Sequence, residues 1–327
     1  MTMTASNRRD FLTTASLAGL AAATPLMAPR ITQAAAPMLG ASQATYRRVK
    51  LGGFEITTIY DGERSVGQTY PFFGANASEE EVQALAQANL LPADRMSLGF
   101  TPTLVNTGDE VILFDAGNGT GRGPDTGKLV ERLATAGITP DQVDVVVLTH
   151  FHFDHIGGLM ADGEAVFPNA RYVAAASEYD FWTNPDLANS DALGNGHQMV
   201  MSNVVPMVEK TTFISNGEDV VSGVTAIAAY GHTPGHTAYH IESEGQRLVI
   251  TADAANHFVL SLQRPDWHFT FDMDGEAAAK ARKDLFGMIA ADQVPFIGYH
   301  MPFPSIGYVQ AQGRGFHYSP LTYQLDQ

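Results

Sequence analysis

The sequence predicts a mixed α/β protein in which strands alternate with helices within one domain. Hydrophobic runs of strand length recur along the chain, helical stretches separate many of them, and no linker rich in Pro, Gly or Ser divides residues 37–327. The chain has 327 residues, of which 45% are hydrophobic and 17% charged, so it is long enough to bury a large core.

Turn and capping signals place the elements. Gly52-Gly53 within residues 46–60 predicts a β-hairpin, and Ser78 with Glu81 predicts a capping box at the start of a helix. The other expected strands are 101–107, 110–115, 143–149, 171–176, 220–229, 237–242, 247–252 and 294–299, and the other expected helices are 126–136, 177–183, 196–209 and 274–291.

The composition excludes several kinds of site and partner. The chain contains no cysteine, so a transition-metal site must use imidazole and carboxylate ligands. Its formal net charge of −16 disfavours nucleic acid and anionic membranes as partners, because both recruit basic surfaces. A homodimer is one assembly that the sequence allows.

The segment HFHFDH, from His150 to His155, carries the strongest chemical signal. The expected strand 143–149 runs into His150, and residues two apart in an extended chain point to the same side, so His150 and His152 can hold one ion together. Asp154 and His155 follow after the chain turns and are better placed for a second ion. Neutral imidazoles and carboxylates are ligands that suit zinc.

Further ligands are expected where other strands end. The turn-rich segment YGHTPGHT contains His232 and His236, of which one is expected to bind metal and the other to orient it. Asp253 ends the strand expected at 247–252 and could bridge two ions, and His300 ends the last expected strand. Each is a weak signal alone, because single buried Asp and His residues more often cap or pack. Together they complete six or seven ligands on one rim.

These motifs, in this order, resemble the pattern of the metallo-β-lactamase fold superfamily. The resemblance covers essentially the whole chain after the N-terminal segment, and it implies an αββα sandwich of two mixed β-sheets flanked by helices, with the metals at one edge. The ligand sets that it implies are His150, His152 and His236 for one ion and Asp154, His155 and His300 for the other, with Asp253 bridging.

The resemblance also implies two supporting residues. His232 is then the non-ligand histidine of its motif. Asp115, in LFDAGNG, corresponds to an aspartate that orients a metal ligand from outside the site.

Three longer stretches of sequence indicate which members of this superfamily the chain resembles. Residues 167–182, 231–248 and 300–315 are similar to methyl parathion hydrolase and its phosphotriesterase-like and lactonase-like kin, whereas HFHFDH is equally similar to acyl-homoserine lactonases. Asn256 disfavours a plain lactonase, because that group has a tyrosine three residues past the bridging aspartate. True β-lactamases generally lack the aspartate found here at position 253.

The expected function is hydrolysis by two divalent ions, zinc by ligand type. A hydroxide held between them would attack an uncharged ester, lactone or phosphotriester, with Asp154 and Asp253 as the catalytic carboxylates. Phe72, Phe73 and Trp182 are expected to form an apolar wall for the substrate. The alternatives are a quorum-quenching acyl-homoserine lactonase, a mononuclear-iron persulfide dioxygenase on the same fold, and a periplasmic metal-binding protein without turnover.

Residues 1–36 have the pattern of an export signal. Paired arginines at positions 8 and 9 precede an uncharged stretch rich in Ala, Leu and Thr, and small residues follow. The pattern resembles a twin-arginine signal, whose route exports folded proteins, which suits a protein that acquires its metal first. We expect cleavage, a periplasmic or secreted location, and no stable membrane insertion of the mature chain. A membrane anchor is the alternative, which two prolines in the stretch disfavour.

Overall fold

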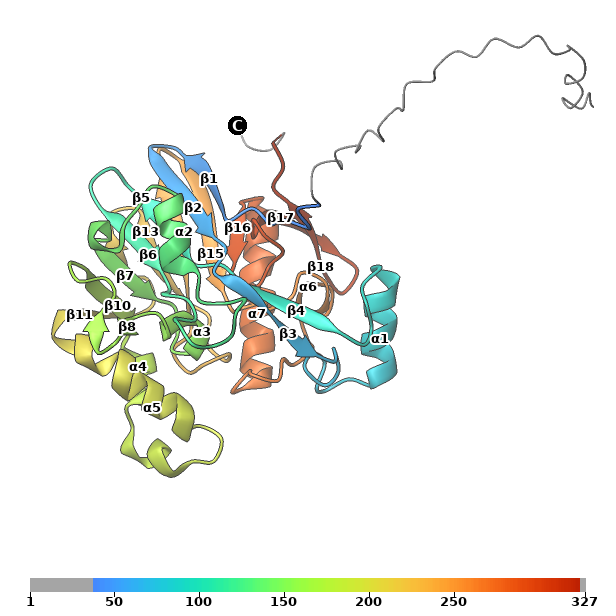
Figure 1. Cartoon of the computed structure of the whole chain (residues 1–327). Helices are drawn as coiled ribbons and strands as arrows, with labels where there is room; N and C mark the ends of the chain where they lie inside the picture. The colour runs from blue at the N-terminus through green and yellow to red at the C-terminus, as the bar shows by residue number, and fades with distance from the viewer. Residues whose placement is uncertain (1–37, 324–327) are drawn as a thin grey trace, which may run out of the picture. The chain divides into compact units, whose positions relative to one another are not determined.

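A computed structural model describes residues 38–323, so the export signal expected at residues 1–36 lies outside the described residues. From Gln43 onward the chain forms one compact unit, drawn in Figure 1. Within residues 38–323, no helix has the length and apolar character needed to cross a membrane.

The first of two large sheets in the described residues has seven strands. In spatial order they are β1 (Tyr46–Leu51), β2 (Phe54–Ile59), β5 (Thr103–Asn106), β6 (Val111–Phe114), β7 (Val145–Leu148), β10 (Arg171–Ala175) and β11 (Thr211–Ile214). The strands from β1 to β6 pair antiparallel, and β6, β7, β10 and β11 run parallel.

The second large sheet also has seven strands within the same range of residues. In spatial order they are β12 (Asp219–Val221), β13 (Val224–Ala228), β14 (Thr237–Ser243), β15 (Gln246–Ala252), β16 (Phe296–Gly298), β17 (Ile306–Gln312) and β18 (Gly315–Pro320). Its neighbours are antiparallel except for β15 and β16, which run parallel.

The two sheets pack face to face, and helices cover their outer faces. On β7, Val145 and Val147 belong to the core between the sheets, whereas Val146 and Leu148 pack toward the helices on the other side. A strand buried on both faces reads as a continuous apolar run. The helical elements are α1 (Glu79–Ala88), α2 (Leu129–Thr135), α3 (Phe153–Ile156), α4 (Ala176–Trp182), α5 (Gly194–Asn203), α6 (Leu260–Gln263), α7 (Gly275–Asp292) and the 3₁₀ turns η1 (Pro140–Gln142), η2 (Pro185–Asn189) and η3 (Val205–Lys210).

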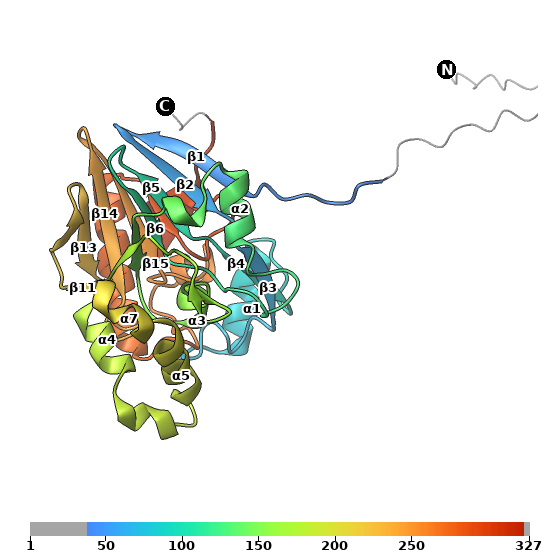
Figure 2. The same cartoon turned by 60° about the vertical axis from the view of Figure 1, so that its left-hand side comes forward.

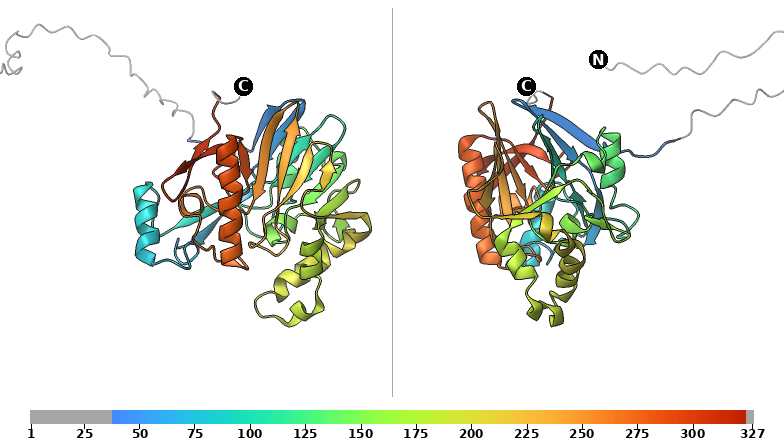
Figure 3. Two further views of the ribbon diagram at one scale, coloured as in Figure 1. Left: turned by 180° about the vertical axis from the view of Figure 1, so that it is seen from behind. Right: turned by 90° about the vertical axis from the view of Figure 1, so that its left-hand side faces the viewer.

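This layering confirms the predicted αββα sandwich. The right-hand view of Figure 3 shows α7 on one side of the stacked sheets and α2 on the other. In Figure 2, α4 and α5 lie together beside α3. Two short hairpins complete the described structure: β3 (Gly62–Gly67) with β4 (Met96–Phe100), and β8 (Met160–Ala161) with β9 (Glu164–Ala165).

Local signals placed several elements correctly. The hairpin around Gly52-Gly53 joins β1 to β2, and Ser78 caps α1 in a reciprocal capping box with Glu81. The predicted strand 220–229 is wrong in one respect, because a turn at Ser222-Gly223 divides it into β12 and β13. The predicted helix 196–209 is likewise divided into α5 and η3.

Candidate metal centre

The segment after β7 brings four candidate ligands to one edge of the sandwich. His150 follows the strand, His152 immediately precedes α3, and Asp154 and His155 lie within this short helix. The chain can turn here because Gly158 packs against the carbonyl of Ala116, where a side-chain carbon would overlap the backbone.

Three imidazoles converge in the first half of the site. His152 Nδ1 lies 3.1 Å from His150 Nε2 and 2.9 Å from His232 Nε2. Nitrogen ligands on one tetrahedral zinc ion, at 2.0–2.1 Å from the metal, are about 3.3 Å apart. The spacing of these three nitrogens therefore fits one shared ion.

Asp253 connects this half to the second. It directly follows β15, and its Oδ2 lies 3.4 Å from His232 Nε2 and 3.0 Å from His300 Nε2. Its other oxygen, Oδ1, lies 3.3 Å from His155 Nε2. Asp154 Oδ2 completes the second half, at 3.6 Å from His300 Nε2 and 3.7 Å from His155 Nε2. The Asp253 carboxylate thus faces both halves, as a bridging ligand must.

Two buried polar atoms test whether this arrangement fits metal ions. His155 Nε2 and Asp253 Oδ1 are fully buried, yet neither has a hydrogen-bond partner among the described residues. An unpartnered buried polar atom is costly, and such atoms require an explanation. Metal ions between the converging ligands would satisfy both atoms, so the residues present fit a two-ion centre.

His150 and His152 are held in the neutral form that a metal requires. Burial lowers the pKa of His150 well below its usual value, and the neighbouring His155 and His152 lower it further. Burial, followed by the effect of His232, likewise lowers the pKa of His152. Neutral imidazoles present a lone pair to a cation.

His236 lies beside the metal centre, and both of its ring nitrogens have hydrogen-bond partners in the chain. Its Nδ1 donates to the carbonyl of Ala229 at 3.0 Å, and its Nε2 accepts from the backbone N–H of Asp253 at 3.0 Å. His232, for which the resemblance implied a supporting role, lies in the group of imidazoles with His150 and His152 and is therefore a ligand candidate. The ligand role of His236 stays a prediction.

His232 is oriented by residues that the sequence did not reveal. Its Nδ1 donates to Asp272 Oδ1 at 2.9 Å, while the other carboxylate oxygen of Asp272 accepts from Arg282 at 3.2 Å and from the N–H of Phe269 at 3.0 Å. Arg282 is completely buried and also donates to the carbonyls of Ala254, Pro265 and Trp267. A carboxylate behind a ligand histidine fixes its tautomer and raises its basicity.

Asp115 supports the second half in the same way. Its carboxylate accepts from His155 Nδ1 at 2.8 Å and from the N–H and hydroxyl of Thr149 at 2.9 and 2.8 Å. Asp115 has a φ of 64°, and Ala252, which precedes Asp253, has a φ of 43°. Backbone strain of this kind in non-glycine residues persists where the surroundings enforce it, commonly at functional sites.

Glu178 connects two loops of the site by hydrogen bonds. One loop contains His150 and His152, and the other contains His232 and His236. Its buried carboxylate accepts from the N–H of Phe151, the indole of Trp182, the hydroxyl of Thr233 and the N–H of Gly235, at 2.7–2.9 Å. Burial raises the pKa of Glu178, against the effect of these four donors. One side chain therefore fixes the chain on either side of His150, His152 and His232.

A cavity of about 760 Å³ opens over the metal centre. His152, Asp154, His232, Asp253 and His300 form its polar floor. The apolar residues in its wall include Val66, Phe72, Leu98, Phe100, Trp182, Leu193, Phe269 and Phe271.

The aromatic part of the wall differs from the prediction at one residue. Phe72 and Trp182 line the cavity, but Phe73 does not. Phe73 is buried behind the wall, stacked on Phe269 with 4.7 Å between ring centroids. The prediction for Phe73 is therefore wrong, because successive side chains of the 70–74 segment point to different sides. Phe269 and Phe271 were missed because nothing in their local sequence distinguishes wall from core.

A two-ion centre of histidines and aspartates at the edge of an αββα sandwich defines the structural class of this chain. Residues 101–294 match the Metallo-beta-lactamase superfamily domain, and the chain belongs to that superfamily.

Known relatives fall within the same superfamily. The chain is 29% identical over 133 residues to the N-acyl homoserine lactonase AttM of Agrobacterium fabrum and 27% identical over 129 residues to the lactonase AiiA of Bacillus thuringiensis subsp. kurstaki. These matches cover 38% and 39% of this chain. They span 46% and 45%, less than half, of the relatives' own lengths.

Solved structures match over a longer part of the chain. The dizinc quorum-quenching lactonase AidC, in complex with a product, superposes with a TM-score of 0.77 at 27% identity over 85% of this chain and 98% of its own. The hydrolase AbOPH superposes with a TM-score of 0.79 at 26% identity over 86% of this chain and 99% of its own.

Proposed function

We propose that the chain is a metal-dependent hydrolase of ester bonds that uses two zinc ions. The observation that carries the proposal is the convergence of two ligand groups on Asp253, beneath a largely apolar cavity. The proposed ligands are His150, His152 and His232 for one ion, Asp154, His155 and His300 for the other, and Asp253 for both. The lactonase and hydrolase relatives support this activity.

When bound, two divalent ions supply a water-derived nucleophile at neutral pH and polarise the oxygen of the scissile group. The chain's own residues position the reactants. Asp154 is a ligand carboxylate that lines the cavity, as Asp253 does, so it can accept a proton from the attacking water. Its backbone is fixed by the hydroxyl of Tyr299, which donates to the Asp154 carbonyl at 2.5 Å.

The cavity supports an uncharged substrate with an apolar body. Phe72, Phe269 and Phe271 form an aromatic cluster with ring centroids 5.2–5.5 Å apart, and Trp182 lies beside His152. Apolar walls with a few convergent polar groups are typical of small-molecule sites. A lactone or carboxylic ester is the leading substrate class, because both AttM and AidC are lactonases.

Asn256 favours a phosphotriester as the second candidate. This side chain is completely buried and does not line the cavity; its Nδ2 donates to Asp253 Oδ2 at 2.9 Å. Acyl-homoserine lactonases resemble this chain but have a tyrosine at the position. The absence of that tyrosine is the departure from the lactonase pattern that keeps a phosphotriester as the second candidate.

The test is to measure kcat/KM of the zinc-loaded protein on an acyl-homoserine lactone, a phenyl ester and an aryl dialkyl phosphotriester. A hundredfold preference for the lactone corresponds to about 2.7 kcal/mol in the barrier and supports the leading class. A preference of that size for the phosphotriester supports the second candidate. No hydrolysis of any of the three contradicts the proposed function.

We also propose that the chain is exported in folded form and acts in the periplasm or outside the cell. The proposal rests on the paired arginines and the uncharged stretch of the N-terminal segment. Replacing both arginines by lysine should retain the protein in the cytoplasm. An unchanged distribution in cell fractions would contradict it.

A further inference from the structure

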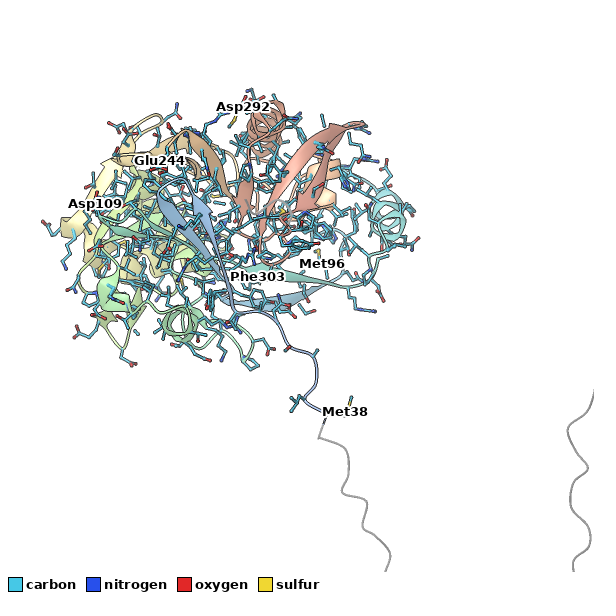
Figure 4. The ribbon with its side chains drawn as sticks, turned by 90° about the horizontal axis from the view of Figure 1, so that it is seen from above. Met38, Met96, Asp109, Glu244, Asp292 and Phe303 are labelled. Atoms are coloured by element: carbon cyan, nitrogen blue, oxygen red, sulfur yellow. The ribbon has the colours of Figure 1, made fainter. Side chains whose placement is uncertain are left out.

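A second cavity, of about 280 Å³, lies apart from the metal centre. It is bounded by β3, by the end of α1 and the start of β4, and by the segment that precedes α6. Met96, labelled in Figure 4, and Ser97 are the β4 residues that line it. Ser65 lines both cavities, but none of the candidate metal ligands lines this one. The second cavity therefore needs its own explanation.

His257 presents a free donor in this cavity. Its side chain lines the cavity, and the residue is 7% exposed. Its Nδ1 accepts from the backbone N–H groups of Val259 and Leu260, at 3.0 and 3.1 Å. The ring proton must therefore be on Nε2, which donates to no acceptor in residues 38–323. Burial lowers the pKa of His257 to about 3, so the ring is a neutral donor at physiological pH.

Thr69 adds a second polar group without a partner. The residue lines the same cavity, is 2% exposed, and its Oγ1 has no hydrogen-bond partner in the part of the chain described. A buried hydroxyl left unpaired costs about 1–3 kcal/mol. Among the described residues, Thr69 Oγ1 is a buried hydroxyl without a partner and His257 Nε2 is a donor without an acceptor, so the two groups together favour a molecule that accepts hydrogen bonds from both.

The rest of the lining defines the chemistry of that molecule. No aspartate or glutamate lines the cavity, although the chain carries 35 of them, and its charged residue is Arg95, whose exposed guanidinium also lies 3.6 Å from Asp94. The other lining residues are mostly apolar: Ala86, Leu91, Pro92, Met96, Phe258 and Leu260, with Ser65 and Ser97. The imidazole Nε2–H of His257 and the guanidinium of Arg95 only donate, and the hydroxyls can donate too, so the lining favours an acceptor-rich group, and its apolar residues favour a short hydrocarbon body.

We propose that this cavity is a binding site for a small aliphatic monocarboxylate. The carboxylate oxygens accept from His257 Nε2 and Thr69 Oγ1, Arg95 supplies the positive charge, and the aliphatic tail packs against Leu91 and Leu260. The inference is independent of the proposed hydrolase function, because the lining contains no candidate metal ligand.

The probe is 6,6,6-trifluorohexanoate, followed by ¹⁹F NMR with the metal-loaded full chain. Carboxylates also bind metal ions, so two bound signals are expected, one from each cavity. His257→Asn retains an acceptor for the two backbone N–H groups and removes the Nε2 donor. Thr69→Val removes the hydroxyl at nearly constant shape. Each variant should weaken the second-cavity signal at least tenfold and leave the metal-centre signal unchanged.

Phe271→Leu is the matched control, because Phe271 lines only the cavity over the metal centre. It should change the metal-centre signal alone. A single bound signal in the wild-type chain overturns the proposal, as does unchanged affinity of both signals in Thr69→Val. If His257→Asn melts at a lower temperature than the wild type, Thr69→Val decides, since it leaves the two backbone contacts of His257 intact.

Discussion

Asp272 is predicted to control metal affinity although it is not a ligand. In Asp272→Asn, one oxygen and one amino group replace two acceptor oxygens. If the remaining oxygen accepts from His232 Nδ1, the amino group faces two other donors, the N–H of Phe269 and the guanidinium of Arg282. The opposite orientation leaves His232 without an acceptor. Neither orientation satisfies all three donors.

The magnitude follows from these contacts. Loss of a carboxylate behind a ligand histidine weakens metal binding about 10- to 100-fold, or about 1.4–2.7 kcal/mol. Removing one partner of a buried ion pair destabilises a fold by about 3–5 kcal/mol. Arg282 retains its three carbonyl partners, so we expect Asp272→Asn to lower the free energy of unfolding by about 3 kcal/mol, the lower end of that range.

The assay is competition for zinc against a chromogenic chelator, together with urea unfolding of the metal-free protein. Asp284→Asn is the control, because Asp284 lies on the same helix, α7, and forms only an exposed pair with Lys280. The control should match the wild type in both measurements. Zinc affinity of Asp272→Asn within twofold of wild type would refute the proposed support of His232.

Three further predictions concern the histidine loops and the metal. In metal analysis, His232→Ala should lower zinc affinity at one site at least a hundredfold, whereas His236→Ala should lower it less than tenfold; the reverse order would show that His236 is the ligand. Glu178→Gln replaces a carboxylate that accepts four hydrogen bonds by an amide whose amino group can only donate. Urea unfolding should therefore show a free energy of unfolding lower by about 2–4 kcal/mol, and unchanged stability would contradict the structural role of Glu178. Chelation should abolish ester hydrolysis and added zinc should restore it; hydrolysis that persists in the metal-free protein would contradict a metal-dependent reaction.

Elements with local signals could be predicted from the sequence. The β1–β2 hairpin depends on a glycine pair, and α1 depends on a capping box, and both signals lie within a few residues. The strand before His150 was also predictable, since burial on both faces makes β7 a continuous apolar run. The strands β3, β4, β17 and β18 were not predicted, because their residues mix polar and apolar types and tertiary pairing decides them.

The sequence alone does not decide between His232 and His236 as the metal ligand. The two histidines are four residues apart in one turn-rich segment, and both are buried. Their roles depend on distant partners: Asp272 lies 40 residues beyond His232, and Asp253 lies 17 residues beyond His236. No local pattern encodes those contacts. The same holds for Glu178 and Arg282, whose importance comes from the loops that they join.

Metal content and hydrolysis measured in one titration test the central claim most directly. The metal content of the protein as purified is measured first, and the metal-free protein is then titrated with zinc while bound zinc and turnover of the preferred ester are followed together. We expect saturation at two zinc ions per chain, with hydrolysis appearing as the sites fill. One iron per chain as purified, with no hydrolysis after zinc loading, would contradict this in favour of a mononuclear dioxygenase, and bound zinc without turnover of any ester would contradict it in favour of a metal-binding protein.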